Sequence, residues 1–281
     1  MIVGDGAAGL GSSIVGVASL GMYDMPWIAA CNDAIWVGLR QRLRDAGIAG
    51  APETLERAAA PSELWQAPHL LLAQICGYPM LALGDAVQLV ATPVYDIQGC
   101  KGPFYRSLVV VADRVAANSV QELRGLRAAV NEWNSNSGMN TFRAAVAPHA
   151  GGRAFFAEVV KTGGHLLSLA ALREGRADVA AIDCVTYGLT ARHRPDLLAG
   201  TRVIDATAAT PGLPLITGAA TPPRTFAALQ QALRGVLADP GLAWPRAGLG
   251  LAGFANLPRE AYATIADLEH EAVALGYPTL A

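Results

Sequence analysis

The sequence is poor in lysine and in charge of either sign. Its only lysines are Lys101 and Lys161, charged residues make up 16% of the 281, and the net charge is −2. The arginines are scattered along the chain, so no segment resembles a surface for a polyanion. We therefore expect no nucleic-acid partner.

Long hydrophobic runs are also missing. Hydrophobic residues make up 52% of the chain, which is typical of a well-packed globular protein, but no apolar run reaches the length of about 18 residues that a membrane-spanning helix needs. The first basic residue is Arg40, so residues 1–39 lack the positively charged start of a signal peptide. We expect no membrane insertion and, for the chain as written, no address for export.

Cysteine is scarce and widely spaced. The four cysteines, Cys31, Cys76, Cys100 and Cys184, contain no C-x-x-C pair, so neither zinc binding nor haem attachment is indicated. We predict no metal and no cofactor. Reduced cysteines are the commoner state, but a pairing of Cys76 with Cys100 is sterically conceivable if their loops meet.

Glycine is abundant, and one group of glycines imitates a cofactor motif. Residues 4–9 spell G-x-G-x-x-G, the pattern of a dinucleotide-binding turn. The strand before it would be a stub at residues 1–3, and the helix after it would contain Gly11 and Gly16, each costing roughly 1 kcal/mol. We interpret residues 1–13 as a glycine-rich leader rather than a cofactor loop.

Apolar periodicity predicts an alternation of strands and helices. Residues 27–46 carry apolar side chains at steps of three and four, as in an amphipathic helix. Strands are expected at 15–20, 87–91, 105–112, 127–131, 159–162, 178–183, 201–205 and 213–218, and further helices at 68–75, 166–174, 224–238 and 259–275. This alternation predicts an α/β fold with mostly parallel sheets flanked by helices.

Three strand-to-helix turns are rich in small polar residues: 135–140, 163–168 and 183–186. In open α/β sheets, ligands bind beyond the carboxyl ends of the strands, where helix N-termini point. The three turns are therefore expected to face a common crevice.

The first turn has the composition of an oxyanion cradle. Ser135 and Ser137 offer hydroxyl donors, Asn136 lies between them, and Gly138 permits close approach to backbone N–H groups at a helix start. Ordinary helix capping would favour the same residue types, so both interpretations stay open for this turn alone.

His165 and Asp183 occupy the other two turns. His165 precedes a helix, and Asp183 ends an apolar strand, where a buried carboxylate needs a partner. Helix capping or a structural role would account for each of them equally well. Ser137, His165 and Asp183 could also form a hydrolase triad, although the G-x-S-x-G elbow is absent. A metal site from His149, His165 and Asp183 is weaker, because no two of them have the spacing of a ligand pair.

Three tyrosines lie in turns after predicted elements: Tyr23, Tyr78 and Tyr95. A phenol at the rim of a cleft can donate a hydrogen bond to an anion and supply an apolar wall. Each alone would be explained as a half-buried aromatic, but together they favour a binding role.

Several of these motifs together resemble the phosphate/phosphite/phosphonate-binding component of ABC transporters, which has the type 2 periplasmic-binding-protein fold. The resemblance runs in order from about residue 19 to residue 238. The motifs that carry it are Met22–Pro26, Cys76–Pro79, Ala91–Tyr95, Tyr105–Ser107, Asn134–Asn140, Thr162–His165 and Gly175–Asp183.

The resemblance implies two α/β lobes that close on a ligand without chemistry. Lobe I would comprise 14–102 and 200–281, and lobe II would comprise 103–199. The two-segment hinge would fall near 102–109 and 194–202. An ABC permease is the implied partner, and we expect the chain itself to be a monomer.

Carried over to this chain, the family's oxyanion turn corresponds to Ser135–Gly138, its histidine to His165, its acidic residue to Asp183, and an aromatic from the other lobe to Tyr78. Asn136 and Gly164 stand where the family has Thr and Ser, which removes two hydroxyl donors. The resemblance implies a periplasmic location, whereas the missing export signal leaves a cytoplasmic one open. Two alternatives also stay open: an organic ligand bound by the same fold in transport or sensing, and the Ser/His hydrolase.

Overall fold

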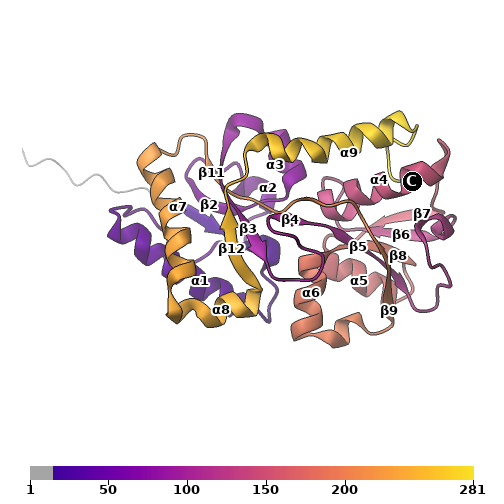
Figure 1. Ribbon diagram of the computed structural model, residues 1–281, viewed down its shortest axis with the longest axis horizontal. Helices are drawn as coiled ribbons and strands as arrows, with labels where there is room; N and C mark the ends of the chain where they lie inside the picture. The colour runs from indigo at the N-terminus through magenta and orange to yellow at the C-terminus, as the bar shows by residue number, and fades with distance from the viewer. Residues whose placement is uncertain (1–14) are drawn as a thin grey trace, which may run out of the picture.

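The computed structural model describes residues 15–281 and divides them into two α/β lobes side by side (Figure 1). The glycine-rich leader that we predict at residues 1–13 lies outside the described residues. Each lobe is built on a five-stranded sheet. This arrangement confirms the predicted α/β class and the two-lobed organisation.

The first sheet contains strands from both the beginning and the end of the chain. In sheet order they are β1 (Val17–Ser19), β2 (Leu70–Gln74), β11 (Leu215–Gly218), β3 (Val87–Tyr95) and β12 (Leu251–Ala255). Only β1 and β2 pair in parallel, and the other three pairings are antiparallel. This sheet is therefore mixed rather than mostly parallel, because β11 and β12, which come after the second lobe in the sequence, are antiparallel to β1, β2 and β3.

Helices cover this first sheet. They are α1 (Ala29–Asp45), α2 (Pro61–Leu64), α3 (Gly77–Leu83), α7 (Pro223–Ala238) and α8 (Ala243–Leu249). The predicted helix at 27–46 is confirmed as α1, and its apolar face is buried: Ile35, Leu39 and Leu43 of α1, and Ile28, which precedes it, are at most 3% exposed. The same face of α1 contacts α7 and α8, which explains the periodicity in the sequence.

The second sheet holds the residues of the predicted turns at its edge. Its order is β7 (Glu158–Lys161), β6 (Arg127–Val130), β8 (Val179–Asp183), β5 (Ser107–Ala112) and β9 (Thr201–Ala206). β7, β6 and β8 are parallel, and β5 is antiparallel to both β8 and β9. Helices α4 (Thr141–Ala150), α5 (His165–Arg173) and α6 (Cys184–His193) follow β6, β7 and β8 in the chain.

Two chain segments cross between the lobes, at 96–106 and 207–214, and they pair with each other. β4 (Phe104–Tyr105) and β10 (Thr210–Pro211) form a two-stranded antiparallel ladder there. The predicted second crossing at 194–202 is wrong, because β9 pairs with β5 as an edge strand of the second sheet. Lobe II therefore extends past residue 199.

The C-terminal segment forms a third connection between the lobes. Helix α9 (Ala263–Ala274) places Ile265, near its start, in the core of the first lobe and Ala272, near its end, in the core of the second, and Figure 1 shows it lying along both. The Phe155 N–H then donates to the Ala281 carbonyl at 2.6 Å. The assignment of 200–281 wholly to lobe I is thus wrong for the last helix.

One predicted element has the wrong type. Residues 68–75 were expected to form a helix, but 70–74 form β2, whose five residues are all buried. A short, mostly apolar run has no periodicity that separates a buried strand from a buried helix. β12, α3 and α8 were not predicted, because short elements interrupted by Gly or Pro give weak signals.

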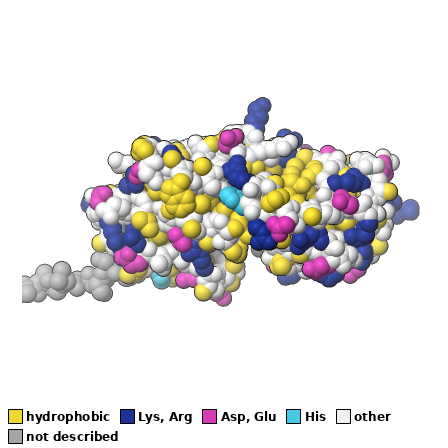
Figure 2. Space-filling view, turned by 90° about the horizontal axis from the view of Figure 1, so that it is seen from below, with side chains coloured by type: hydrophobic (Ala, Val, Ile, Leu, Met, Phe, Trp, Pro, Cys, Tyr) yellow, Lys and Arg dark blue, Asp and Glu magenta, His cyan; other side chains and the backbone are white. Residues whose placement is uncertain are grey.

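The surface agrees with the low charge of the sequence. Figure 2 shows basic and acidic side chains interspersed over the face seen from below, with a notch between the two lobes. Among the helices of residues 15–281, none has the length and apolar character that crossing a membrane requires.

Candidate ligand-binding site

A cavity of about 650 Å³ opens between the lobes and gathers most of the predicted site residues. The first lobe contributes the turn Gly21–Pro26, and the second lobe contributes the ends of β6, β7 and β8 with the starts of the helices that follow. The predicted convergence of the three strand-to-helix turns on one crevice is thus what the structure shows.

Ser135 and Ser137 lie at the floor of this cavity, 5% and 4% exposed. Ser135 caps a π-helical turn, Asn136–Asn140, that leads directly into α4, and its Oγ accepts a 3.1 Å hydrogen bond from the Gly138 N–H. The two serine Oγ atoms are 3.5 Å apart. The turn therefore presents two hydroxyls beside the positive end of a helix.

Asn136 and Gly138 support the turn and do not line the cavity. The Asn136 amide donates to the Thr210 hydroxyl at 2.9 Å and to the Tyr105 hydroxyl at 3.2 Å, which links the cradle to the paired crossing segments. A Cβ at Gly138 would stand 1.9 Å from Asn131 Oδ1. Glycine is therefore needed here to make room for a side chain of the same lobe, whereas the prediction was that it lets a ligand approach the backbone.

His165 is the first residue of α5, and its ring reaches the cradle. Its Nε2 lies 2.9 Å from the Ser137 Oγ and 3.4 Å from the Asn131 amide nitrogen. Burial lowers the pKa of His165 to about 4, so the imidazole is neutral at pH 7. It can serve as a hydrogen-bond partner for a ligand without adding a charge.

Asp183 is the only member of the predicted site that carries a charge, and it is 1% exposed. Its Oδ1 accepts hydrogen bonds from the Val185 and Thr186 N–H groups at 2.7 and 3.0 Å, which caps α6. Burial raises its pKa to about 6, although these hydrogen bonds oppose the shift. The carboxylate thus remains ionised for the most part at neutral pH, at the edge of the cavity.

Tyr23 reaches this carboxylate from the first lobe. Its hydroxyl donates to the Asp183 Oδ2 at 2.7 Å, and its ring stacks edge-on against Tyr95 with centroids 5.4 Å apart. Burial, with Asp183 as the next contribution, raises the pKa of Tyr23 well above its usual value. The phenol therefore stays protonated and donates.

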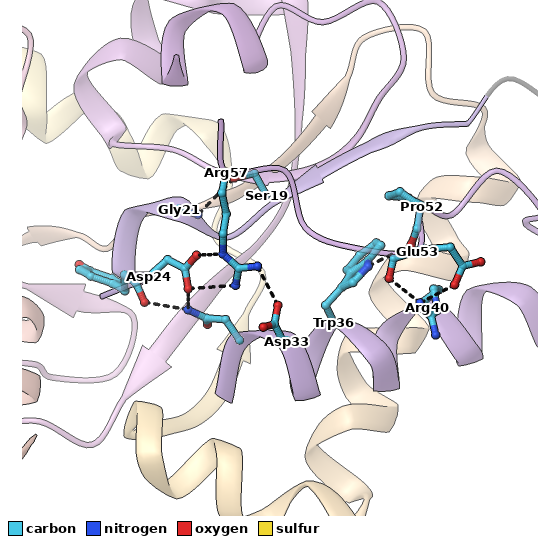
Figure 3. Close-up of polar contacts among 11 residues, drawn as sticks. Ser19, Gly21, Asp24, Asp33, Trp36, Arg40, Pro52, Glu53 and Arg57 are labelled. Carbon is cyan, nitrogen blue, oxygen red and sulfur yellow. Dashed lines mark hydrogen bonds and ion pairs between the residues drawn. The ribbon is translucent and has the colours of Figure 1, made fainter. Parts of the chain in front are cut away.

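Arg57 fixes the turn that carries Tyr23. Its Nε donates to Asp24 Oδ2 at 2.5 Å, and its Nη1 pairs with Asp33 at 2.9 Å on α1, as Figure 3 shows. Asn32 adds hydrogen bonds of 2.9 Å to the Tyr23 carbonyl and to Asp24 Oδ1. Asp24 is 7% exposed at its side chain and lines the cavity, so the sequence prediction missed a wall residue here.

Tyr78 and Tyr95 are not where the binding prediction needs them. The Tyr78 hydroxyl donates to Glu269 on α9 at 2.7 Å, outside the cavity lining. The Tyr95 hydroxyl accepts from the Gln74 amide at 3.3 Å in the interior behind Tyr23. Of the three tyrosines, only Tyr23 lines the cavity, so this geometry does not support Tyr78 or Tyr95 as ligand contacts.

The carboxylate side chains of the cavity wall come from both lobes. Among residues 15–281, the lining includes Asp24, Glu132 and Asp183 but neither lysine nor arginine. Asp24 is paired with Arg57 and Glu132 with Lys161, both outside the lining. Any anion held here is bound by hydroxyls, amides and helix N-termini, which act without a formal positive charge.

The geometry separates this arrangement from a hydrolase triad. Ser137 and His165 are within hydrogen-bond distance of each other. The Asp183 carboxylate, however, accepts its hydrogen bonds from the Tyr23 hydroxyl and from backbone N–H groups of α6. Within residues 15–281, no group of three or more His, Cys, Asp or Glu residues is placed to hold a metal ion. His149 lies near the end of α4.

An open cavity between two α/β lobes, with polar side chains from three strand-to-helix turns converging on it, is the arrangement of a substrate-binding protein of the type 2 periplasmic class. The family model described as "ABC transporter, phosphonate, periplasmic substrate-binding protein" matches residues 66–279. The chain therefore belongs to the family of periplasmic phosphonate-binding proteins of ABC transporters. The members of this family bind substrates and are not catalysts, and their partner is a permease.

Solved structures share the fold at low sequence identity. The binding component of an ABC phosphonate transporter from Pseudomonas aeruginosa superposes with a TM-score of 0.76 at 16% identity, covering 94% of this chain and 88% of that one. The phosphonate-binding protein PhnD1 of Prochlorococcus marinus in complex with methylphosphonate gives 0.73 at 14%, covering 92% and 98%. The alkanesulfonate-binding protein SsuA of Xanthomonas axonopodis, bound to MOPS, gives 0.63 at 15%, covering 95% and 96%. The sequence matches no curated protein.

Proposed function

We propose that this chain binds a small phosphorus oxyanion, namely phosphate, phosphite or a phosphonate, in the interlobe cavity and delivers it to an ABC permease from the periplasm. The observation that carries the proposal is the cradle: Ser135 and Ser137 beside a helix start, with His165 Nε2 2.9 Å from the Ser137 Oγ. Membership of the phosphonate-binding family supports it.

The donors of the cradle fit a tetrahedral oxyanion. Each phosphorus-bound oxygen can accept two or more hydrogen bonds, and charge-assisted bonds to an anion are stronger than neutral ones. Ser135 and Ser137 are almost completely buried, so water competes little for them. The N-terminal ends of α4 and α5 add partial positive charge at the same point.

The size and the walls of the cavity favour a ligand with an organic substituent. A volume of about 650 Å³ is more than a bare phosphate fills and lies within the usual range for small-molecule sites. Beyond the cradle, the walls include the apolar residues Met22, Trp65 and Leu213. We therefore expect a phosphonate to bind more tightly than inorganic phosphate.

Calorimetric titration of the purified chain tests the proposal. Phosphate, phosphite, methylphosphonate and 2-aminoethylphosphonate are titrated separately, and the expected result is saturable binding with a phosphonate as the tightest ligand. The absence of heat with all four would contradict the proposal. Native mass spectrometry of the protein as purified adds a second test, because an organic co-purifying ligand without phosphorus would favour the same fold with a different cargo.

A further inference from the structure

The four cysteines lie in different surroundings, and two of them lie close together. The Cys100 Sγ is 3.6 Å from the Cys184 Sγ. Cys76 instead accepts a hydrogen bond from the Asn136 N–H at 3.3 Å, beside the cradle. The pairing that the sequence left conceivable, Cys76 with Cys100, is therefore not the one that the fold favours.

The backbone is shaped to hold Cys100 against Cys184. Gly99 has φ +100°, and a Cβ there would stand 2.8 Å from the Cys184 Cβ and 3.1 Å from its Sγ. Ile97 packs on the next turn of α6 at Gly188, so closely that a Cβ at Gly188 would stand 2.4 Å from the Ile97 Cγ2. The first crossing segment, 96–106, thus lies on the first turns of α6.

We propose that Cys100 and Cys184 form a disulfide when the protein is exposed to the oxidising periplasm. The inference goes beyond the proposed ligand, and it rests on the periplasmic character of the family for its oxidant. A disulfide needs an S–S distance of about 2.05 Å. The two sulfurs, 3.6 Å apart, must therefore approach by about 1.5 Å.

The order of the steps follows from exposure. Cys100 is partly exposed, whereas Cys184 is completely buried, and the neighbouring Cys100 thiol and burial both raise the pKa of Cys184. The Cys100 thiolate attacks the disulfide of a periplasmic dithiol oxidant or of oxidised glutathione and releases one of its thiols. This leaves Cys100 joined to the oxidant in a mixed disulfide. The Cys184 sulfur then attacks the Cys100 sulfur, forms the Cys100–Cys184 bond and displaces the second thiol of the oxidant, which has then gained the two electrons and two protons that the cysteines lose.

The crosslink would join the crossing segment to the ligand site. Cys184 directly follows Asp183, whose carboxylate edges the cavity. The closed loop, 100–184, also contains the cradle and His165. Tying its ends reduces the conformational entropy of the unfolded chain and stabilises the folded lobe.

The experiment oxidises the native full-length chain with oxidised glutathione after complete reduction and desalting. The protein is then denatured in N-ethylmaleimide, and its free thiols and crosslinked peptides are measured by mass spectrometry. We expect two of the four cysteines to escape alkylation and a peptide pair joined through Cys100 and Cys184. Reduction of the oxidised protein should lower its Tm by roughly 10 °C.

Two variants sharpen the result. Cys100→Ala should lose the crosslink and the redox-dependent Tm, while the matched control Cys31→Ala should keep both, since Cys31 lies on α1 against Gly248. Four alkylated cysteines after prolonged oxidation, glutathione retained on Cys100, or a crosslink through Cys76 would each overturn the proposal.

Discussion

Tyr23 and Asp183 form a hydrogen bond of 2.7 Å from one lobe to the other at the edge of the ligand cavity. Both side chains are buried, at 4% and 1% exposure. The carboxylate also caps α6. The same two residues therefore join the lobes and shape the cavity, so a change at either is expected to affect closure as well as stability.

Removing the phenol hydroxyl in Tyr23→Phe should lower the free energy of unfolding by about 1–3 kcal/mol, because a buried carboxylate loses a donor. Urea unfolding measures this cost, and calorimetry should show weaker phosphonate binding. Tyr78→Phe is the matched control: its hydroxyl bonds Glu269 outside the cavity, so ligand affinity should stay within about twofold of the wild type. Weaker binding in Tyr78→Phe alone would restore Tyr78 as a ligand contact.

Ser137→Ala should weaken phosphonate binding by roughly 10-fold or more, since a hydrogen bond to a charged ligand contributes about 1.5–3 kcal/mol. Ser168→Ala removes an equally buried serine of the same lobe, whose Oγ bonds the Thr162 hydroxyl at 2.7 Å away from the cavity lining. It should reduce stability and leave affinity unchanged. Equal effects of the two changes on affinity would contradict the cradle.

Asp183 should give folding a specific pH dependence. Its folded pKa of about 6 exceeds the unfolded value of about 3.9, so folding favours the protonated carboxyl. The contribution of this group to the free energy of unfolding is therefore complete below about pH 4 and is lost as the pH rises through 6. Between pH 4 and 7 the wild type should therefore lose about 3 kcal/mol relative to Asp183→Asn. Burial of His165 has the opposite sign in this range, but it is present in both proteins and cancels in the comparison. The free energy of unfolding of both proteins is measured in urea at each pH. If the two values changed in parallel between pH 4 and 7, the raised pKa of Asp183 would be refuted.

Gly138→Ala tests the close approach inside the cradle. The new Cβ would stand 1.9 Å from Asn131 Oδ1, so Asn131 must move, at a cost of about 1–3 kcal/mol. In an Asn131→Ala background the same change should cost much less. A double-mutant cycle from denaturant unfolding measures this coupling, and purely additive costs would show that the clash is not the cause.

Arg57→Ala should loosen the turn that carries Tyr23, because Asp24 loses its contacts to the guanidinium. Because the Arg57 side chain is 38% exposed, we expect a stability loss of only about 1–2 kcal/mol together with weaker ligand binding. The control is Arg44→Ala, whose partner Glu53 is 69% exposed, and exposed pairs contribute at most about 1 kcal/mol. If both variants bind the ligand as the wild type does, Arg57 has no role in positioning the turn.

Local signals in the sequence were enough to find the second lobe's part of the site. Ser135 and Ser137, His165 and Asp183 each lie where a strand gives way to a helix, and the carboxyl ends of neighbouring parallel strands meet at one edge of a sheet. The geometry that unites them therefore follows from chain order and strand direction alone.

Long-range partners could not be predicted in the same way. Tyr78 and Tyr23 both occupy turns, but the partner of Tyr78 is Glu269, 191 residues away, whereas the partner of Tyr23 is Asp183. Nothing local distinguishes a tyrosine that faces a cavity from one that faces a helix. The membership of β9 in the second sheet and the path of α9 are non-local for the same reason.

The path of α9 has a mechanical consequence for the cradle. The Asn140 amide, in the turn that holds the serines, donates to the Ile265 carbonyl at 2.8 Å, and Arg143 donates to the Pro278 carbonyl at 2.7 Å. Any rotation that parts the lobes must pull on these bonds or free one end of the helix. The C-terminal segment therefore tethers the two lobes, so that opening of the cleft is coupled to the position of the turn that would hold the anion.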